Sequence, residues 1–166
     1  EDSTFFHPDE CENLFQIADK IVAPSFDGPP GVAWKEQNAI QKHIISCASL
    51  KCISLNDIRK KKFKIVIDAV NGAGSDALPA LLESLGCEVV ELNCQPSGVF
   101  NRGTEPLPEN LTDLSNAVIQ NNADAGFAVD PDADRLAVVD ENGKPLGEEY
   151  TLVLAADGYM KNVKKE

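Results

Sequence analysis

The sequence has few of the residues that build zinc sites and disulfide frameworks. Its two histidines, His7 and His43, lie far apart, and its five cysteines show no Cys-x-x-Cys spacing. These patterns argue against a histidine-based metal centre, a zinc site and a disulfide framework. They favour reduced thiols in a cytoplasmic protein.

Long hydrophobic runs and an excess of basic residues are also missing. No apolar stretch is long enough to span a bilayer, so no membrane partner is expected. The formal net charge of -12 repels phosphate backbones and argues against nucleic-acid binding. The local exception is the basic run at residues 59–62, which we interpret as a solvated turn before a buried strand.

What remains is the composition of a globular protein, with 43% hydrophobic and 25% charged residues in a chain of 166. That length predicts one domain, with room for a piece of a neighbouring one. Because the sequence begins at Glu1, we expect a trimmed or processed fragment of a longer protein.

Two helices are expected before the first strand. Residues 8–21 carry Pro8 near the start, acidic residues at the positive end of the helix dipole, and an apolar stripe. Residues 36–50 form the second helix, on which His43 is a surface or packing residue and not a ligand. Between the helices, residues 24–31 are rich in proline and glycine and are the candidate linker.

From residue 64 onward, short β-branched runs alternate with helical patterns. Strands are expected at residues 64–68, 88–92, 125–129 and 136–139, and helices at residues 77–85, 111–121 and 148–161. This alternation predicts parallel strands with right-handed crossovers, while the short connection before the last strand makes that strand antiparallel. The expected fold class is α/β: a small mixed sheet of three parallel strands plus one antiparallel strand, flanked by helices in a three-layer α/β/α arrangement.

Three aspartates at alternate positions follow the third predicted strand: Asp130, Asp132 and Asp134. The carboxyl ends of such strands are where α/β sheets place ligands. Crowded carboxylates raise one another's pKa unless a cation neutralises them, and hard oxygen ligands select Mg²⁺ or Ca²⁺. The next residue, Arg135, adds a positive fork suited to phosphate.

Three interpretations of this loop compete: a solvated acidic turn, an EF-hand, and a Mg²⁺ site that handles phosphate. Asp130, Asp132, Asp134 and Glu141 fall at EF-hand positions 1, 3, 5 and 12. However, position 6 requires glycine and here holds Arg135, and strand-like runs flank the loop where an EF-hand has helices. The Mg²⁺ site is therefore favoured.

A glycine-rich turn links the first strand to its helix. Gly72-x-Gly74-x-x-Ala77 matches the dinucleotide fingerprint in its Gly/Ala form, and Glu91 lies about 20 residues on, as that motif requires. The sequence leaves three interpretations open: a tight turn that needs glycine backbone angles, a dinucleotide-binding Rossmann-like module, and a functional loop that faces a neighbouring domain.

Five segments, taken together in their order and spacing, resemble the phosphoglucomutase/phosphomannomutase superfamily of phosphohexomutases. They are the strand and turn that begin at Lys64, then Pro79-Ala-Leu-Leu-Glu-Ser-Leu-Gly-Cys, Glu105-Pro-Leu-Pro-Glu-Asn-Leu, Asp130-Pro-Asp-Ala-Asp-Arg-Leu and Gly147-Glu-Glu-Tyr-Thr-Leu. The resemblance covers roughly residues 34–162. It implies that residues 1–30 are the C-terminal tail of a preceding domain with its linker, and that residues 31–166 are the family's second, metal-binding domain.

The resemblance also implies a reaction. In this family a phosphoserine on the first domain donates phosphate to a hexose monophosphate of glucose, mannose or glucosamine. The resulting 1,6-bisphosphate reorients and returns its other phosphate to the serine, which interconverts the 1- and 6-phosphates. By resemblance, Asp130, Asp132 and Asp134 hold Mg²⁺ together with the phosphoserine, and Arg135 contacts the phosphoryl group being moved.

The sequence also departs from the family pattern. The serine signature of the first domain and the sugar- and phosphate-binding loops of the third and fourth domains are absent. Residues 103–106 look like part of the phosphate-binding loop, but their place in the second domain speaks against that role. We therefore expect the fragment to be inactive alone, to act on a hexose phosphate with other domains of the same chain, and to self-associate through surfaces those domains would cover. A free-standing metal-binding domain is the alternative.

Overall fold

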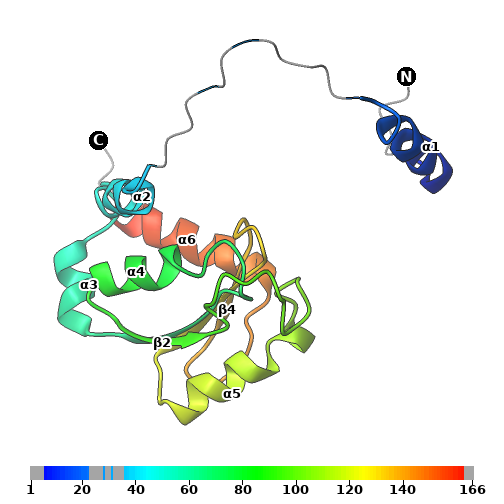
Figure 1. Cartoon of the computed structure of the whole chain (residues 1–166). Helices are drawn as coiled ribbons and strands as arrows, with labels where there is room; N and C mark the ends of the chain where they lie inside the picture. The colour runs from blue at the N-terminus through cyan, green and yellow to red at the C-terminus, as the bar shows by residue number, and fades with distance from the viewer. Residues whose placement is uncertain (1–5, 23–27, 29–30, 32–35, 163–166) are drawn as a thin grey trace. The chain divides into compact units, whose positions relative to one another are not determined.

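The structure, a computed structural model, describes residues 6–22, 28, 31 and 36–162 (Figure 1). The chain divides into two compact units, Glu1–Lys35 and Glu36–Glu166, which are described separately. Residues 24–31, the predicted linker, lie outside the described residues apart from Gly28 and Gly31.

The first unit contains helix α1, Pro8–Ala18. Its first turn carries Asp9 and Glu10, whose charges favour the positive end of the helix dipole. The carboxylate of Glu10 accepts a hydrogen bond of 2.8 Å from the backbone N–H of His7, just before the helix. The predicted helix is confirmed, and it ends a turn earlier than residue 21.

The second unit is built on a four-stranded sheet in the order β2-β1-β3-β4. Its strands are β1 (Lys64–Asp68), β2 (Glu88–Leu92), β3 (Ala125–Val129) and β4 (Leu136–Val139). β1 pairs in parallel with both β2 and β3, whereas β4 pairs antiparallel with β3. The predicted mixed sheet of three parallel strands and one antiparallel strand is confirmed, with the strand bounds that the β-branched runs indicated.

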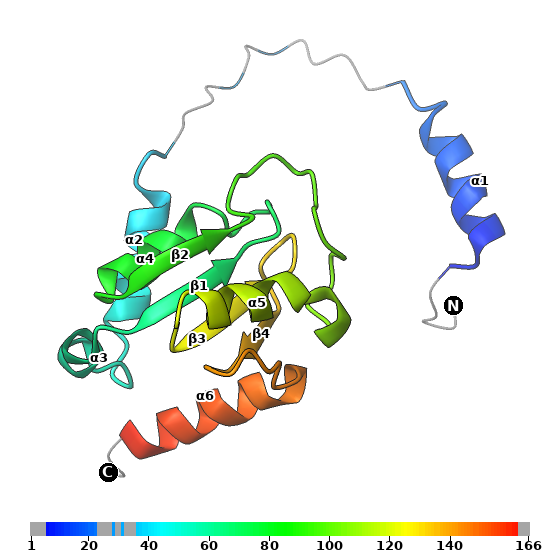
Figure 2. The same ribbon diagram turned by 90° about the horizontal axis from the view of Figure 1, so that it is seen from below.

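The strand order sets where the helices lie. β2 and β3 flank β1 on opposite sides, so right-handed crossovers put helices α4 (Ala77–Ser84) and α5 (Thr112–Gln120) on opposite faces. Figures 1 and 2 show α4 and α5 on the two faces of the sheet. The result is the predicted three-layer α/β/α arrangement. Outside these layers, α2 (Ala39–Ala48) packs on α4, and α6 (Glu148–Asn162) packs on β4.

The core lies between α5 and the sheet. Leu114 and Val118 of α5 are fully buried against Val66 and Ala128 of the central strands. Gly126 lets the helix approach closely, because a Cβ atom there would lie 2.7 Å from a methyl group of Val118. Burial of this apolar face fixes β1 and β3 side by side, and so fixes the loops that follow them.

One helix was not predicted. Helix α3, Leu55–Lys61, contains most of the basic run at residues 59–62, so that run is exposed and precedes β1 as predicted, but it ends a helix and is not a turn. Cationic side chains suit the negative end of a helix, and Lys62 ends this one with a φ of 51°. Arg59 also donates from Nη2 to the backbone oxygen of Ser84, 2.7 Å away, and so caps α4. A short 3-10 helix, Pro108–Asn110, precedes α5.

Among the described residues, every helix is too short or too polar to cross a lipid bilayer.

Candidate metal centre

Three carboxylates converge at the carboxyl end of β3. Asp130, Asp132 and Asp134 each offer an oxygen, and these oxygens all lie within 4.8 Å of one another. Asp130 is buried, whereas the other two side chains face solvent. The loop that carries them is called the metal loop below, residues 130–135. The structure therefore brings together the three residues that the sequence singled out.

Backbone hydrogen bonds shape the metal loop around Asp130. One of its carboxylate oxygens, Oδ1, accepts from the backbone N–H groups of Asp134 and Arg135, each at 3.1 Å. Ala133 adopts the left-handed conformation, with φ of 62°, and donates to the backbone oxygen of Asp130. This tight turn brings the exposed aspartates toward the buried one, at the cost of placing an alanine in a region that disfavours side chains.

The charges of the loop are not balanced within the triad. Repulsion from Asp132, and then from Asp130, raises the pKa of Asp134 above its ordinary value of 3.8. Arg135 offsets part of this charge, since its Nε lies 3.7 Å from Asp130 Oδ2 and 3.9 Å from Asp134 Oδ1. A divalent cation among the three carboxylates would remove the repulsion, and oxygen donors of this kind suit Mg²⁺. The donor set therefore fits the metal that the sequence predicted.

The surrounding elements do not fit an EF-hand. β3 and β4 flank the loop, where an EF-hand needs two helices. Glu141, the residue at position 12 of that pattern, follows the far end of β4, and β4 leads away from the triad. The fourth EF-hand ligand is thus carried away from the other three.

Arg135 lies beside the triad as the sequence predicted. Its side chain is 48% exposed, so the guanidinium is open to a ligand from solvent. A third ion pair joins it to Glu105, which comes from the loop after β2. Glu105 belongs to one of the segments that carry the family resemblance, but its contact with Arg135 was not predicted.

A buried ion pair beneath the loop was also missed. Asp68 ends β1 and Arg102 lies in the loop after β2, and their side chains are 1% and 7% exposed. Arg102 Nε donates to Asp68 Oδ2 at 2.8 Å, and Nη2 donates at 2.7 Å to the backbone oxygen of Val129. A carboxylate directly after the apolar residues 65–67 was the only sequence signal, and it did not point to a partner 34 residues away.

The glycine turn after β1 packs against the metal loop. A Cβ atom on Gly72 would lie 2.5 Å from the backbone oxygen of Pro131, and the N–H of Ala73 donates to that same oxygen at 2.8 Å. The N–H groups of Gly72 and Ser75 are also used within the protein. A dinucleotide site would need such N–H groups to face the pyrophosphate. Gly72 therefore serves the close approach of two loops, which accounts for its place in the fingerprint without a dinucleotide.

Replacing Gly72 with alanine tests this close approach. The added methyl group meets backbone atoms of Pro131, which cannot rotate away, so we expect a loss of about 1–3 kcal/mol in the free energy of unfolding. Gly158 on α6 is the control, because a Cβ atom there meets no atom within 4 Å. Gly158→Ala should be neutral or stabilising by up to about 1 kcal/mol, as expected for a helical glycine. Urea denaturation measures both, and equal effects would contradict the role of Gly72.

The raised pKa of Asp134 predicts a pH-dependent penalty in the metal-free protein. A carboxyl whose pKa is raised on folding favours the fold below its ordinary value of 3.8, and that contribution is lost as the pH rises through the folded pKa. The side chain in Asp134→Asn cannot ionise, so the variant does not lose this stability as the pH rises. The melting temperature of the variant should therefore exceed that of the wild type at neutral pH, and the gap should shrink toward pH 4. Because the side chain is exposed, added salt should also shrink the gap. A gap that grows as the pH falls would contradict this account.

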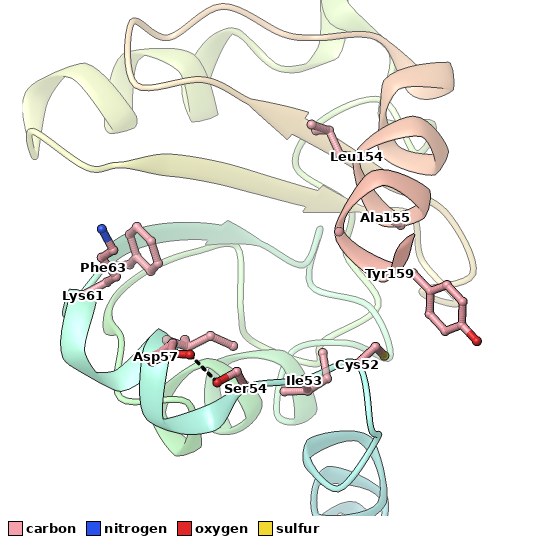
Figure 3. Close-up of a pocket in the computed structure, with 11 residues that line it drawn as sticks. Cys52, Ile53, Ser54, Asp57, Lys61, Phe63, Leu154, Ala155 and Tyr159 are labelled. Carbon is pink, nitrogen blue, oxygen red and sulfur yellow. Dashed lines mark hydrogen bonds between the residues drawn. The ribbon is translucent and has the colours of Figure 1, made fainter. Parts of the chain in front are cut away.

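A cavity of about 750 Å³ lies at the end of the sheet that is opposite the metal loop. It is lined by Phe63, which precedes β1, by Ile53 and Ile58, and by Leu154 and Tyr159 of α6. Figure 3 shows side chains entering it from the α3 side and from α6, with the Ser54–Asp57 hydrogen bond of 2.6 Å at its edge. Its lining is mainly apolar, and, within the part of the chain that the structure describes, Asp57 does not stand in a cluster of carboxylates such as the one at the metal loop.

Comparison with known protein families decides what this domain is. Residues 41–143 match the family described as phosphoglucomutase/phosphomannomutase, alpha/beta/alpha domain II. The chain belongs to the phosphoglucomutase/phosphomannomutase family. The matched range contains all four strands and the whole metal loop, and it ends before α6.

Curated relatives carry the names of the same family. The chain is 38% identical over 133 residues to a phosphoglucomutase/phosphomannomutase of Thermococcus kodakarensis, covering 77% of this chain and 29% of that protein. It is 50% identical over 101 residues to a probable phosphoglucosamine mutase of Pyrococcus horikoshii, covering 61% and 22%. A probable phosphoglucosamine mutase of Methanopyrus kandleri is 35% identical over 155 residues, covering 92% and 33%. The chain thus spans no more than about a third of the length of these relatives.

Solved structures agree with the fold. A phosphoglucomutase/phosphomannomutase family protein of Burkholderia thailandensis superposes with a TM-score of 0.63 at 25% identity, over 94% of this chain and 32% of that one. A putative phosphomannomutase from Thermus thermophilus superposes with a TM-score of 0.61 at 23% identity, over 75% of this chain and 28% of that one.

Proposed function

We propose that this chain is the metal-binding part of a phosphohexomutase that interconverts the 1- and 6-phosphates of a hexose. Residues 1–30 are the tail of a preceding domain with its linker, and residues 31–166 are the metal-binding domain. The observation that carries the proposal is the convergence of three carboxylates within 4.8 Å at the carboxyl edge of a sheet that matches this family.

In this proposal Asp130, Asp132 and Asp134 hold Mg²⁺. Asp130 is the fixed member, since its Oδ1 is tied to two loop N–H groups. The exposed Asp132 and Asp134 are free to turn their carboxylates toward a cation. When bound, Mg²⁺ supplies positive charge that stabilises a phosphoryl group during its transfer.

Arg135 is proposed to contact the phosphoryl group. Its planar guanidinium can donate two parallel hydrogen bonds to phosphate oxygens, which orients the group as well as attracting it. The backbone N–H of Arg135 donates a hydrogen bond to the carboxylate of Asp130. The residue that would bind phosphate is thus fixed to a residue that would hold the metal. This hydrogen bond would keep Mg²⁺ and the guanidinium of Arg135 on the same side of the loop.

The serine that would carry phosphate, and most of the sugar-binding surface, belong to other domains in this proposal. The isolated chain is therefore expected to be inactive. The reduced cysteines suit a cytoplasmic protein, and the net charge of -12 disfavours nucleic acid as a partner. The names of the relatives favour phosphoglucosamine mutase or a mixed phosphoglucomutase/phosphomannomutase activity.

Expression of the full coding sequence that contains this segment tests the proposal. Conversion of hexose 1-phosphates to 6-phosphates, followed by ³¹P NMR with glucose, mannose and glucosamine phosphates, should require Mg²⁺ and be lost in Asp132→Asn. A full-length protein that folds, binds Mg²⁺ and converts none of these sugars would overturn it. If the coding sequence ends where this chain ends, the free-standing metal-binding domain is favoured.

The outer face of α6 is proposed to be covered by other domains of the same chain. The helix contacts β4 on one side, and Leu152 and Met160 are 75% and 73% exposed. Such apolar side chains favour association when their cover is missing. We expect the isolated chain to self-associate at high concentration, and Leu152→Glu with Met160→Glu to reduce the molar mass measured by light scattering. An unchanged mass distribution would exclude α6 as the surface.

A further inference from the structure

One short segment touches the metal loop at both of its ends. Arg102 donates to the backbone oxygen of Val129, which immediately precedes the triad, and Glu105 pairs with Arg135, which immediately follows it. Both contacts come from the loop between β2 and α5. The segment of residues 102–105 therefore brackets the metal loop.

The segment is itself held firmly. The side-chain amide of Asn110 donates to the backbone oxygen of Glu105 at 2.8 Å, and Arg102 Nη1 donates to the backbone oxygen of Gly103 at 2.9 Å. Gly103 is packed against Asn110 so closely that a Cβ atom there would lie 2.3 Å from its amide nitrogen. The segment can thus transmit a fixed geometry to the loop it contacts.

Arg102 is placed to position the loop and not to bind a ligand. Its side chain is 7% exposed, and its donors are directed at Asp68 and at backbone oxygens. The carboxylate of Asp68 cancels its charge, so the guanidinium does not repel a cation at the nearby triad. What it fixes is the point where β3 ends and the metal loop begins.

Glu105 acts at the other end, on Arg135. The guanidinium of Arg135 is attracted by Asp130 and Asp134 at 3.7 and 3.9 Å, and Glu105 attracts it from the opposite loop. Without Glu105, the guanidinium would settle over the aspartates, where it would compete with a metal ion for the same oxygens.

We propose that Arg102 and Glu105 are positioning residues for the metal site. Arg102 fixes the start of the metal loop, and Glu105 keeps the guanidinium of Arg135 away from the three carboxylates. This inference rests on the proposed Mg²⁺ site. Residues that orient metal ligands typically change metal affinity by about 10–100-fold when they are replaced.

Calorimetric titration of the purified chain with Mg²⁺, at a temperature well below unfolding, tests the Arg102 contact. Arg102→Lys keeps the charge opposite Asp68, but a single ammonium cannot reach Asp68 and Val129 in the fork geometry. We expect Mg²⁺ to bind about tenfold more weakly. In the double variant Asp68→Asn with Arg102→Met the buried charges are removed together, which restores stability but not the bond to Val129. Wild-type Mg²⁺ affinity in Arg102→Lys, or in a double variant as stable as the wild type, would overturn the role of Arg102.

Glu105→Gln tests the second contact with a matched control. Glu105 is 45% exposed, so the variant will fold, and the neighbouring Glu109 is exposed and has no ion pair among the residues that the structure describes. Each substitution removes one negative charge from the connection between β2 and α5. We expect Glu105→Gln to weaken Mg²⁺ binding about tenfold and Glu109→Gln to change it less than about twofold. Equal effects would show a general charge effect and overturn the role of Glu105.

The wild type and Asp132→Asn are titrated in the same series. Failure of the wild type to bind Mg²⁺ would contradict the proposed metal site itself. Mg²⁺ binding that is lost in Asp132→Asn but unchanged in Arg102→Lys and Glu105→Gln would leave that site intact and overturn only the positioning roles.

Discussion

Mg²⁺ is expected to raise the melting temperature of the metal-free chain, and Asp132→Asn to abolish the rise. Binding to the folded state alone stabilises it by about 1.4 kcal/mol when free Mg²⁺ is tenfold above its dissociation constant. For a domain of this size, that corresponds to roughly 3–8 °C. Relief of the repulsion that raises the pKa of Asp134 favours binding and is already contained in the dissociation constant.

The control for this experiment is the same substitution away from the triad. Asp113 is exposed in the first turn of α5, and Asp113→Asn should leave the Mg²⁺ shift unchanged. NaCl at equal ionic strength separates specific binding from screening. A shift that survives in Asp132→Asn would mean that Mg²⁺ binds elsewhere on this acidic protein.

The second large effect is expected at the buried ion pair. Arg102→Ala leaves the carboxylate of Asp68, which is 1% exposed, without its cationic partner. Breaking a buried pair by removing one member costs about 3–5 kcal/mol, a large part of the stability of a domain. Urea denaturation should therefore show a markedly lower free energy of unfolding.

Lys60→Ala provides the comparison, because Lys60 and Asp57 form an ion pair in which both side chains are more than 70% exposed, at 76% and 73%. Exposed pairs contribute about 0–1 kcal/mol, so this variant should be nearly as stable as the wild type. A small effect in Arg102→Ala, comparable to that in Lys60→Ala, would mean that water reaches Asp68 and that the pair is not a structural feature of the site.

The strands could be predicted from the sequence because each is a short β-branched or apolar run with a clear end. Residues 64–68 and 136–139 appear in the structure with the predicted bounds. The antiparallel direction of β4 could be predicted from the length of the connection between β3 and β4, because the metal loop is too short for a crossover. Helix α3 was missed because residues 55–61 carry only two apolar residues at helical spacing, Leu55 and Ile58, and the contact of Arg59 with α4 is one that no local pattern reveals.

The candidate site, like the fold, was predictable from the sequence only in part. The triad is a local pattern, so its residues and their convergence could be predicted from six consecutive positions. The contacts that support the triad are tertiary. Arg102 meets Asp68 across 34 residues, and Glu105 meets Arg135 only because β2 and β3 flank β1 in the sheet. A single sequence carries no signal for such pairings.

The glycine turn shows how a motif can mislead. Gly72 and Gly74 satisfy the dinucleotide fingerprint, yet the structure explains Gly72 by Pro131 and Gly74 by Leu78, whose methyl carbon would lie 2.8 Å from an added Cβ atom. The requirement at Gly72 is steric because it faces backbone atoms, whereas Gly74 faces the end of a flexible side chain, and neither contact needs a ligand. Glycine permits close approach whatever approaches it, so the identity of the neighbour decides the function.

A crystal of this chain soaked in Mn²⁺, measured at a wavelength where manganese scatters anomalously, tests the central claim most directly. We expect one anomalous peak among the carboxylates of Asp130, Asp132 and Asp134, within about 2.0–2.3 Å of an oxygen from each. A peak elsewhere with none at the triad, or three carboxylates that turn apart in the presence of the ion, would contradict it.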